Sequence, residues 1–185
     1  MKAIVRHTAS TETRDTRWYN IADSAILFSP RPYFLPEWLE NPTVTAALAV
    51  RISRLGKTIE PRFASRYFDA ATIALLPHSG QRLHADNALT DSADGALILG
   101  SMIPIEQIGD SPEISISAIA GIWAETALSD WRNLAEEAIA EASLTLTWKT
   151  GDLLCMTLPM NNPIGINHRI RAELNHKETI SVNIK

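Results

Sequence analysis

Residues 44–55 form an apolar, β-compatible stretch in which polar and apolar residues do not alternate. A strand that is covered on both faces is expected to read in this way, because both of its faces must be apolar. Residues 70–76 and 95–105 are further apolar runs of buried-strand length, and Pro104 ends the second of them. These three runs predict a β-rich fold with buried central strands.

Shorter strand signals surround these runs. They are residues 2–6, 25–28, 114–117 and 144–149, of which the last two alternate in polarity. Near the end of the chain, residues 168–174 and 179–185 also alternate, and they flank the turn residues 175–177. This arrangement predicts a β-hairpin.

Two segments predict helices. Residues 60–71 carry Pro61 in what would be the first turn, and residues 130–142 follow Ser129, a suitable N-cap. The apolar residues of the second segment recur at helical spacing, namely Trp131, Leu134, Ala135, Ala138, Ile139 and Ala142. With no linker, repeat or low-complexity segment, we expect a single mostly β (α+β) domain over residues 1–185.

Bulk composition narrows the functional classes. Of the 185 residues, 45% are hydrophobic and 21% are charged, which is typical of a globular protein. No run approaches the ~18 apolar residues of a membrane span, and the start lacks a signal peptide, so we expect a cytoplasmic protein without a membrane partner. The single cysteine, Cys155, lies in an apolar run and is interpreted as a buried structural thiol.

The formal net charge of −4 argues against nucleic-acid binding through bulk electrostatics. One basic stretch stands apart from this acidic background, comprising Arg51, Arg54, Lys57, Arg62 and Arg66. We interpret it as a solvated strand end and helix face. A nucleic-acid surface at this stretch ranks last among the functional hypotheses.

No standard catalytic or phosphate-binding motif occurs in the chain. The best candidate residues from the pattern alone are His78, His84 and Asp86, which lie in a polar segment between two apolar runs. Two imidazoles and a carboxylate could hold a divalent metal with open positions. Their spacing, however, matches no helical or hairpin ligand pattern.

Several segments together resemble the fumarylacetoacetate hydrolase family, and its shorter bacterial acylpyruvate hydrolases and oxaloacetate decarboxylases in particular. Residues 25–30 resemble the family segment "F-K-P", and residues 48–57 resemble its strand "E-L-a-V-v-I-g-r-x-g-k". The most specific match is residues 148–154, which are similar to "L-x-x-G-D-l-i" through Gly151 and Asp152. The resemblance implies a mixed β-sheet roll or barrel with a few short helices, like the family's C-terminal domain.

The family's metal ligands have no counterpart here. The resemblance implies a Glu-x-Glu pair on one strand and an Asp on the next, which hold Mg²⁺ or Mn²⁺. In register with the matching segments, the two glutamates fall on Thr45 and Ala47, and the aspartate falls on Leu76. None of these side chains supplies a carboxylate, so we expect no bound metal cofactor.

Other family positions also differ. The substrate-side lysine falls on Asp91, the "T-G-T-P" loop reads Met156-Thr157-Leu158-Pro159, and the segment with the catalytic histidine falls on residues 9–13, which contain no histidine. These losses predict a catalytically inactive homologue kept for small-molecule binding or protein assembly. The resemblance also implies a homodimer, or a heterodimer with an active paralogue. The alternative is a divergent keto-acid hydrolase or lyase rebuilt around His78, His84, Asp86 and Asp91.

Overall fold

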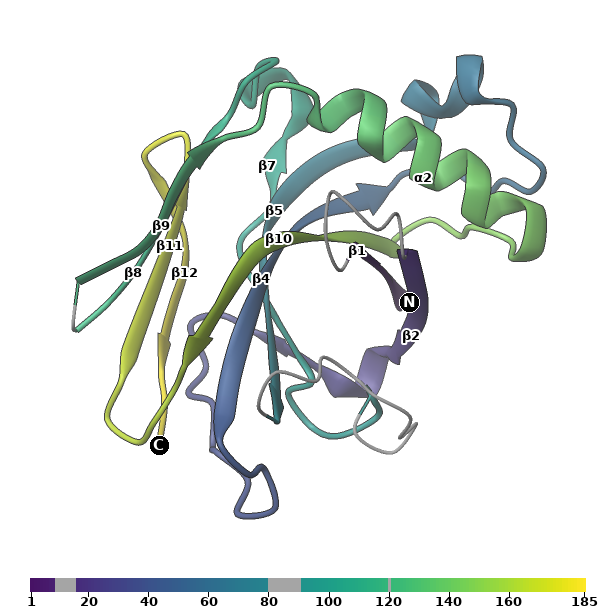
Figure 1. The fold of residues 1–185 in the computed structure, drawn as a ribbon. Coiled ribbons are helices and arrows are strands. Elements are labelled where there is room, and N and C mark those ends of the chain that lie inside the picture. The colour runs from purple at the N-terminus through teal and green to yellow at the C-terminus, as the bar shows by residue number, and fades with distance from the viewer. Residues whose placement is uncertain (9–15, 80–90, 120) are drawn as a thin grey trace.

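A computed structural model describes residues 1–8, 16–79, 91–119 and 121–185 of the chain. Strands dominate, and the larger of two sheets curls round on itself while the smaller sheet and one long helix pack outside it (Figure 1). This architecture confirms the predicted mostly β roll. No helix in the described ranges is long and apolar enough to cross a membrane.

The elements follow one another along the chain with short connections. They are β1 (Lys2–Thr8), β2 (Thr16–Ala22), η1 (Asp23–Ala25), β3 (Ile26–Phe28), β4 (Pro42–Ile52), η2 (Pro61–Tyr67), β5 (Phe68–Ser79), β6 (Leu97–Leu99), β7 (Ile103–Pro104), η3 (Ile105–Gln107), β8 (Glu113–Ala118), β9 (Gly121–Ala127), α2 (Trp131–Thr145), β10 (Leu153–Pro163), β11 (Arg169–Leu174) and β12 (Lys177–Asn183). The three η elements are 3-10 helices.

Within the described residues, the larger sheet runs in the order β2-β1-β10-β4-β5-β6-β3, with β7 also paired to β5. Its pairs are antiparallel except β1 with β10 and β3 with β6, so the sheet is mixed, as predicted. The smaller sheet has the order β12-β11-β8-β9. Strands close in sequence therefore pair mostly with each other, whereas β1 pairs with a strand about 150 residues away.

Both faces of the larger sheet are apolar, and this explains the missing alternation in residues 44–55. Along β4, Val44, Leu48 and Val50 point into the main core, which also contains residues of α2 and of the smaller sheet. Ala47 and Ala49 point the other way, into a second apolar cluster made by the large sheet and its connections. We call this second side the inner face.

Two local predictions were wrong, one in part and one entirely. The helix predicted over residues 60–71 does start at Pro61, but it is only the short 3-10 helix η2. The strand β5 already starts at Phe68. The predicted strand over residues 144–149 does not form, because α2 continues to Thr145 and Trp148 makes an isolated bridge with Gly56. In both places long-range packing prevails over the local pattern.

The C-terminal hairpin and the helix at residues 130–142 are confirmed, but the N-cap is Asp130 and not the predicted Ser129. Asn175 and His176 both have positive φ, at 51° and 59°, and form the two-residue turn between β11 and β12. Such a turn matches the right-handed twist of the strands that it joins. Strands β2 and β9 were not predicted from the sequence.

Candidate functional site

The three positions that align with the family's metal ligands lie together on the inner face. Pairing between β4 and β5 sets Thr45 opposite Leu76 and Ala47 opposite Ala74. Since residues two apart on a strand share a face, Thr45, Ala47 and Leu76 lie side by side on the inner face. All three are buried. The three positions therefore share one buried patch of the inner face.

The side chains at these positions do not fit a divalent metal. Ala47 and Leu76 have no donor atom, and the Thr45 hydroxyl lies 3.0 Å from His78 Nε2. Mg²⁺ and Mn²⁺ prefer anionic oxygen ligands, which a single neutral hydroxyl cannot replace. In the part of the chain that the structure describes, no group of three or more His, Cys, Asp or Glu side chains could hold a metal ion.

Among the predicted candidates that the structure describes, His78 sits beside these positions. It lies on β5 directly opposite Thr43, it is 5% exposed, and its Nδ1 lies 3.2 Å from Thr43 Oγ1. Because its Nε2 also contacts the Thr45 hydroxyl, both ring nitrogens of His78 face threonine hydroxyls. His84 and Asp86 lie outside the described residues, so the structure does not test whether they join His78.

Asp91 lies close enough to Tyr19, a residue packed against the inner face, for its charge to act on the Tyr19 phenol. The pKa of Tyr19, on β2, is raised above its ordinary range by burial, and to a lesser extent by Cys155 and Asp91. The sheet register explains the proximity, because Val5 lies between Tyr19 and Cys155. The Tyr19 phenol therefore stays neutral at physiological pH and can act there as a hydrogen-bonding group.

A further polar pair lies on the same face. His7 Nδ1 and Thr157 Oγ1 are 3.0 Å apart, on the parallel strands β1 and β10. Thr157 belongs to the stretch that aligned with the "T-G-T-P" loop, but here residues 156–159 lie within β10, at a register shift. Neither Tyr19 nor His7 was a candidate from the sequence, since strand pairing alone brings them to this face.

The Cys155 thiol is expected to be unreactive in the folded protein. Its side chain is fully buried, and burial raises the pKa of the thiol to about 12. An unperturbed thiol has a pKa of about 8.5, so the reactive thiolate should be about a thousandfold rarer at pH 8 in the folded protein. We expect a disulfide reagent to modify Cys155 quickly only after denaturation; rapid reaction of the native protein would contradict this placement.

The same shift gives stability a pH dependence. Because the folded-state pKa of the Cys155 thiol exceeds that of the unfolded chain, the folded state holds the proton more tightly. This contribution to stability is complete below about pH 8.5 and is lost as the pH rises toward 12. Burial likewise raises the pKa of Tyr33 to about 12, which adds to the loss in the same direction at high pH.

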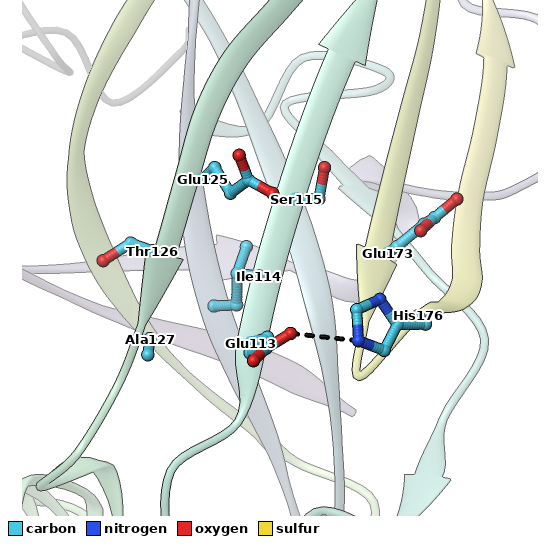
Figure 2. A pocket seen from close by; sticks show the side chains of 8 residues that line it. All are labelled: Glu113, Ile114, Ser115, Glu125, Thr126, Ala127, Glu173 and His176. Atoms are coloured by element: carbon cyan, nitrogen blue, oxygen red, sulfur yellow. Dashed lines mark ion pairs between the residues drawn. The ribbon is translucent and has the colours of Figure 1, made fainter.

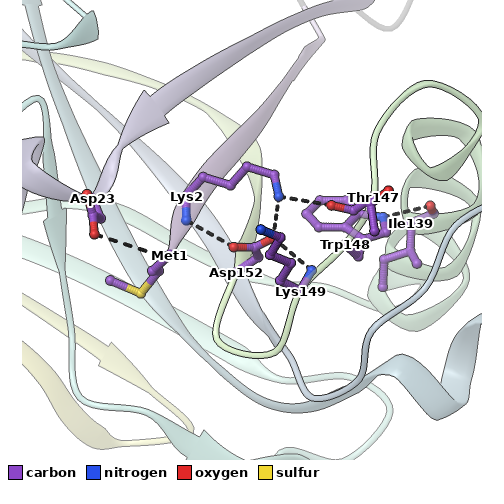
Figure 3. A network of polar contacts seen from close by, with 8 residues as sticks. All are labelled: Met1, Lys2, Asp23, Ile139, Thr147, Trp148, Lys149 and Asp152. Atoms are coloured by element: carbon purple, nitrogen blue, oxygen red, sulfur yellow. Dashed lines mark hydrogen bonds and ion pairs between the residues drawn. The ribbon is translucent and has the colours of Figure 1, made fainter.

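The Gly-Asp motif at residues 151–152 has a structural function. Asp152 is 1% exposed and accepts hydrogen bonds from the backbone N–H groups of Lys2, at 3.0 Å, and Lys149, at 2.9 Å (Figure 3). The Lys2 ammonium also pairs with this carboxylate. Gly151 has φ of +88°, a conformation that favours glycine. The motif thus fastens the turn before β10 to the start of β1.

A different hollow, of about 430 Å³, lies on the smaller sheet and carries acidic side chains (Figure 2). The Glu113 carboxylate pairs with His176 Nε2 at 3.0 Å. Ser115 of β8 lies between its partners Glu125 of β9 and Glu173 of β11. This hollow contains none of the predicted site residues, and its carboxylates give it a negative potential.

Comparison of the sequence with known families and proteins finds no match. No protein-family model matches it, and no curated protein matches it. The chain does resemble solved structures, and the three described next are each less than 20% identical to it in sequence.

Three of these structures have the same fold over the whole chain. A Yersinia pestis protein provisionally assigned to the fumarylacetoacetate hydrolase family is 18% identical, with a TM-score of 0.82, and covers 100% of this chain and 92% of its own. Fumarylpyruvate hydrolase from Pseudomonas aeruginosa, solved with Mn²⁺ and pyruvate, is 14% identical, with a TM-score of 0.82 and coverage of 100% and 89%. 2-Hydroxyhepta-2,4-diene-1,7-dioate isomerase from Mycobacterium marinum is 17% identical, with a TM-score of 0.84 and coverage of 99% and 73%. The chain therefore has the fold of these proteins.

Proposed function

We propose that this chain is a divergent member of the fumarylacetoacetate hydrolase family that has lost metal-dependent catalysis and binds a small, uncharged molecule. The observation that carries the proposal is the set of side chains at Thr45, Ala47 and Leu76. They are aligned across β4 and β5 and buried on the inner face, yet they offer no carboxylate. The shared fold supports the comparison of this face with the metal-binding members of the family.

The character of the inner face favours an uncharged ligand. Its members are mostly small or aliphatic, including Ala47, Ala49, Ala74 and Leu76. An ionised ligand would lose its hydration here without gaining a matching charge, which is costly. The Tyr19 phenol supplies a polar group that could orient a neutral molecule by a hydrogen bond.

Metal titration tests this proposal. We expect calorimetric titration of the chelator-stripped protein with Mn²⁺ or Mg²⁺ to give no binding heat at millimolar metal. The physical reason is that Thr45, Ala47 and Leu76 cannot replace the anionic oxygen ligands of a hard cation. The Pseudomonas aeruginosa hydrolase, which was solved with Mn²⁺, is the positive control. Micromolar binding would overturn the proposal and would make His84→Ala and Asp86→Ala the next variants.

Assembly is a further part of the proposal. We infer that the chain forms a homodimer, or a heterodimer with an active paralogue, as the family resemblance implies. Light scattering after size-exclusion chromatography is expected to give twice the 20.4 kDa chain mass. A monomer at micromolar concentration would contradict the homodimer.

One observation favours a second candidate function, a keto-acid hydrolase or lyase with a rebuilt site. His78 directly adjoins the former ligand positions, and the charge of Asp91 acts on Tyr19 of the same face. His84 and Asp86 would complete such a site. Turnover of an acylpyruvate or of oxaloacetate that disappears in His78→Ala would favour this function over the first.

A further inference from the structure

A small basic hollow lies where the chain leaves β4 and meets the 3-10 helix η2. It has a volume of about 260 Å³ and is lined by Arg54, Leu55, Phe63, Arg66 and Tyr67. We propose that this hollow binds the phosphate group of a small phosphorylated molecule. The site is separate from the inner face and does not depend on the function proposed for that face.

The two arginines of the hollow carry uncompensated charge. Arg51 is paired with Asp69 through two contacts of 2.8 and 3.0 Å, and Arg62 is paired with Glu60 at 2.9 Å. Arg54 and Arg66 form no ion pair with any residue of the described ranges. In a chain with a net charge of −4, two exposed and unpaired guanidinium groups beside one hollow create a local positive potential.

The walls of the hollow are fixed by backbone hydrogen bonds. The Ser53 N–H donates to the Tyr67 carbonyl at 2.8 Å, which holds the end of β4 against the end of η2. Three residues further on, Gly56 and Trp148 exchange backbone hydrogen bonds of 3.0 and 2.8 Å. A Cβ added at Gly56 would lie 2.4 Å from Tyr67 Cε1, so the Tyr67 ring packs directly on this backbone. The hollow is therefore preorganised, which lowers the cost of binding.

Phe63 restrains one of the two arginines of the hollow, Arg66. The Arg66 guanidinium lies 5.0 Å from the centre of the Phe63 ring, and that of Arg62 lies 4.6 Å from it. Contact between a cation and an aromatic face restrains the cation while leaving its N–H groups able to donate. Arg66 thus stays at the wall of the hollow with donors available for an anion.

Size and charge select the ligand. A volume of about 260 Å³ lies below the roughly 300–1,000 Å³ of pockets for drug-sized molecules, so the bound group is small. Two guanidinium groups match the charge of about −1.5 to −2 that a phosphate monoester carries at pH 7, and a monocarboxylate carries only half as much. Guanidinium groups also suit phosphate because they can donate two parallel hydrogen bonds.

Binding of inorganic phosphate and of glycerol phosphate, followed by ³¹P NMR at fixed ionic strength, tests the proposal. We expect saturation at millimolar ligand for the intact protein, and a loss of about tenfold in affinity for Arg54→Ala and for Arg66→Ala. Arg62→Ala is the matched control: it removes a charge from the same 3-10 helix but not from the lining, and should change the affinity by less than about twofold.

The pH dependence provides a second readout. Since the second pKa of a phosphate monoester is about 6, affinity for glycerol phosphate should rise between about pH 5 and pH 7. Acetate binding as tight as phosphate binding would overturn the choice of ligand. Absence of saturation, or an equal loss in Arg62→Ala, would overturn the site. Tighter binding of an oligonucleotide that also requires Lys57 would replace it with a nucleic-acid surface.

Discussion

Replacing Asp152 with alanine is expected to lower the free energy of unfolding by about 3–5 kcal/mol, because it removes a buried carboxylate that accepts several charge-assisted hydrogen bonds. The carboxylate is 1% exposed and is the acceptor for two backbone N–H groups and for the Lys2 ammonium (Figure 3). Urea denaturation followed by circular dichroism measures the change.

The control for this variant is another paired aspartate in a different environment. Asp110 pairs with Arg132 at 3.2 Å, but its side chain is 96% exposed. Asp110→Ala should therefore change stability by no more than about 0.5 kcal/mol. If both variants were equally stable, the contacts of Asp152 would not be what holds β1 to the turn before β10.

Introducing a carboxylate at Leu76 on the inner face is expected to be as damaging. Leu76→Asp places an unpaired charge at a fully buried position next to Thr45 and Ala47, at a cost of about 4 kcal/mol or more. We expect millimolar Mn²⁺ not to rescue it, because a single carboxylate does not make a site for a hard cation. Thermal unfolding with and without the metal measures both effects.

Leu76→Met is the matched variant, since it keeps the volume and the apolar character of the side chain. It should cost less than about 1.5 kcal/mol. A stable Leu76→Asp protein that gains Mn²⁺ affinity would show that neighbouring groups, including His78, already complete a metal site. That result would favour the rebuilt enzyme over the inactive homologue.

Helices and strands were predicted best where a regular pattern of apolar residues extended over many consecutive residues. The apolar period of residues 130–142 identifies α2 because a helix repeats its contacts every three to four residues. The alternation of residues 144–149 predicted a strand, and this prediction was wrong. Leu144 and Thr145 extend the helix, and Trp148 bonds to Gly56 instead of to a neighbouring strand. Five or six alternating residues cannot decide between a helix end and a short strand.

The candidate site was predictable only in part. Its positions Thr45, Ala47 and Leu76 came from the resemblance, and the pairing of β4 with β5 places them together. Tyr19 could not be found, because its proximity to Cys155 depends on two strand pairings that join distant parts of the chain. No local signal encodes such a register.

The parallel pairing of β1 with β10 has a consequence for folding during synthesis. Lys2 reaches its partner Asp152 across a separation of 150 residues, so the first strand stays without this neighbour until most of the chain has left the ribosome. Contacts of such long range make folding slow, and an unpaired strand edge can aggregate while it waits. Pairing with β2 covers only the opposite edge of β1, because β1 lies between β2 and β10, so the edge that faces β10 stays open until β10 has been made.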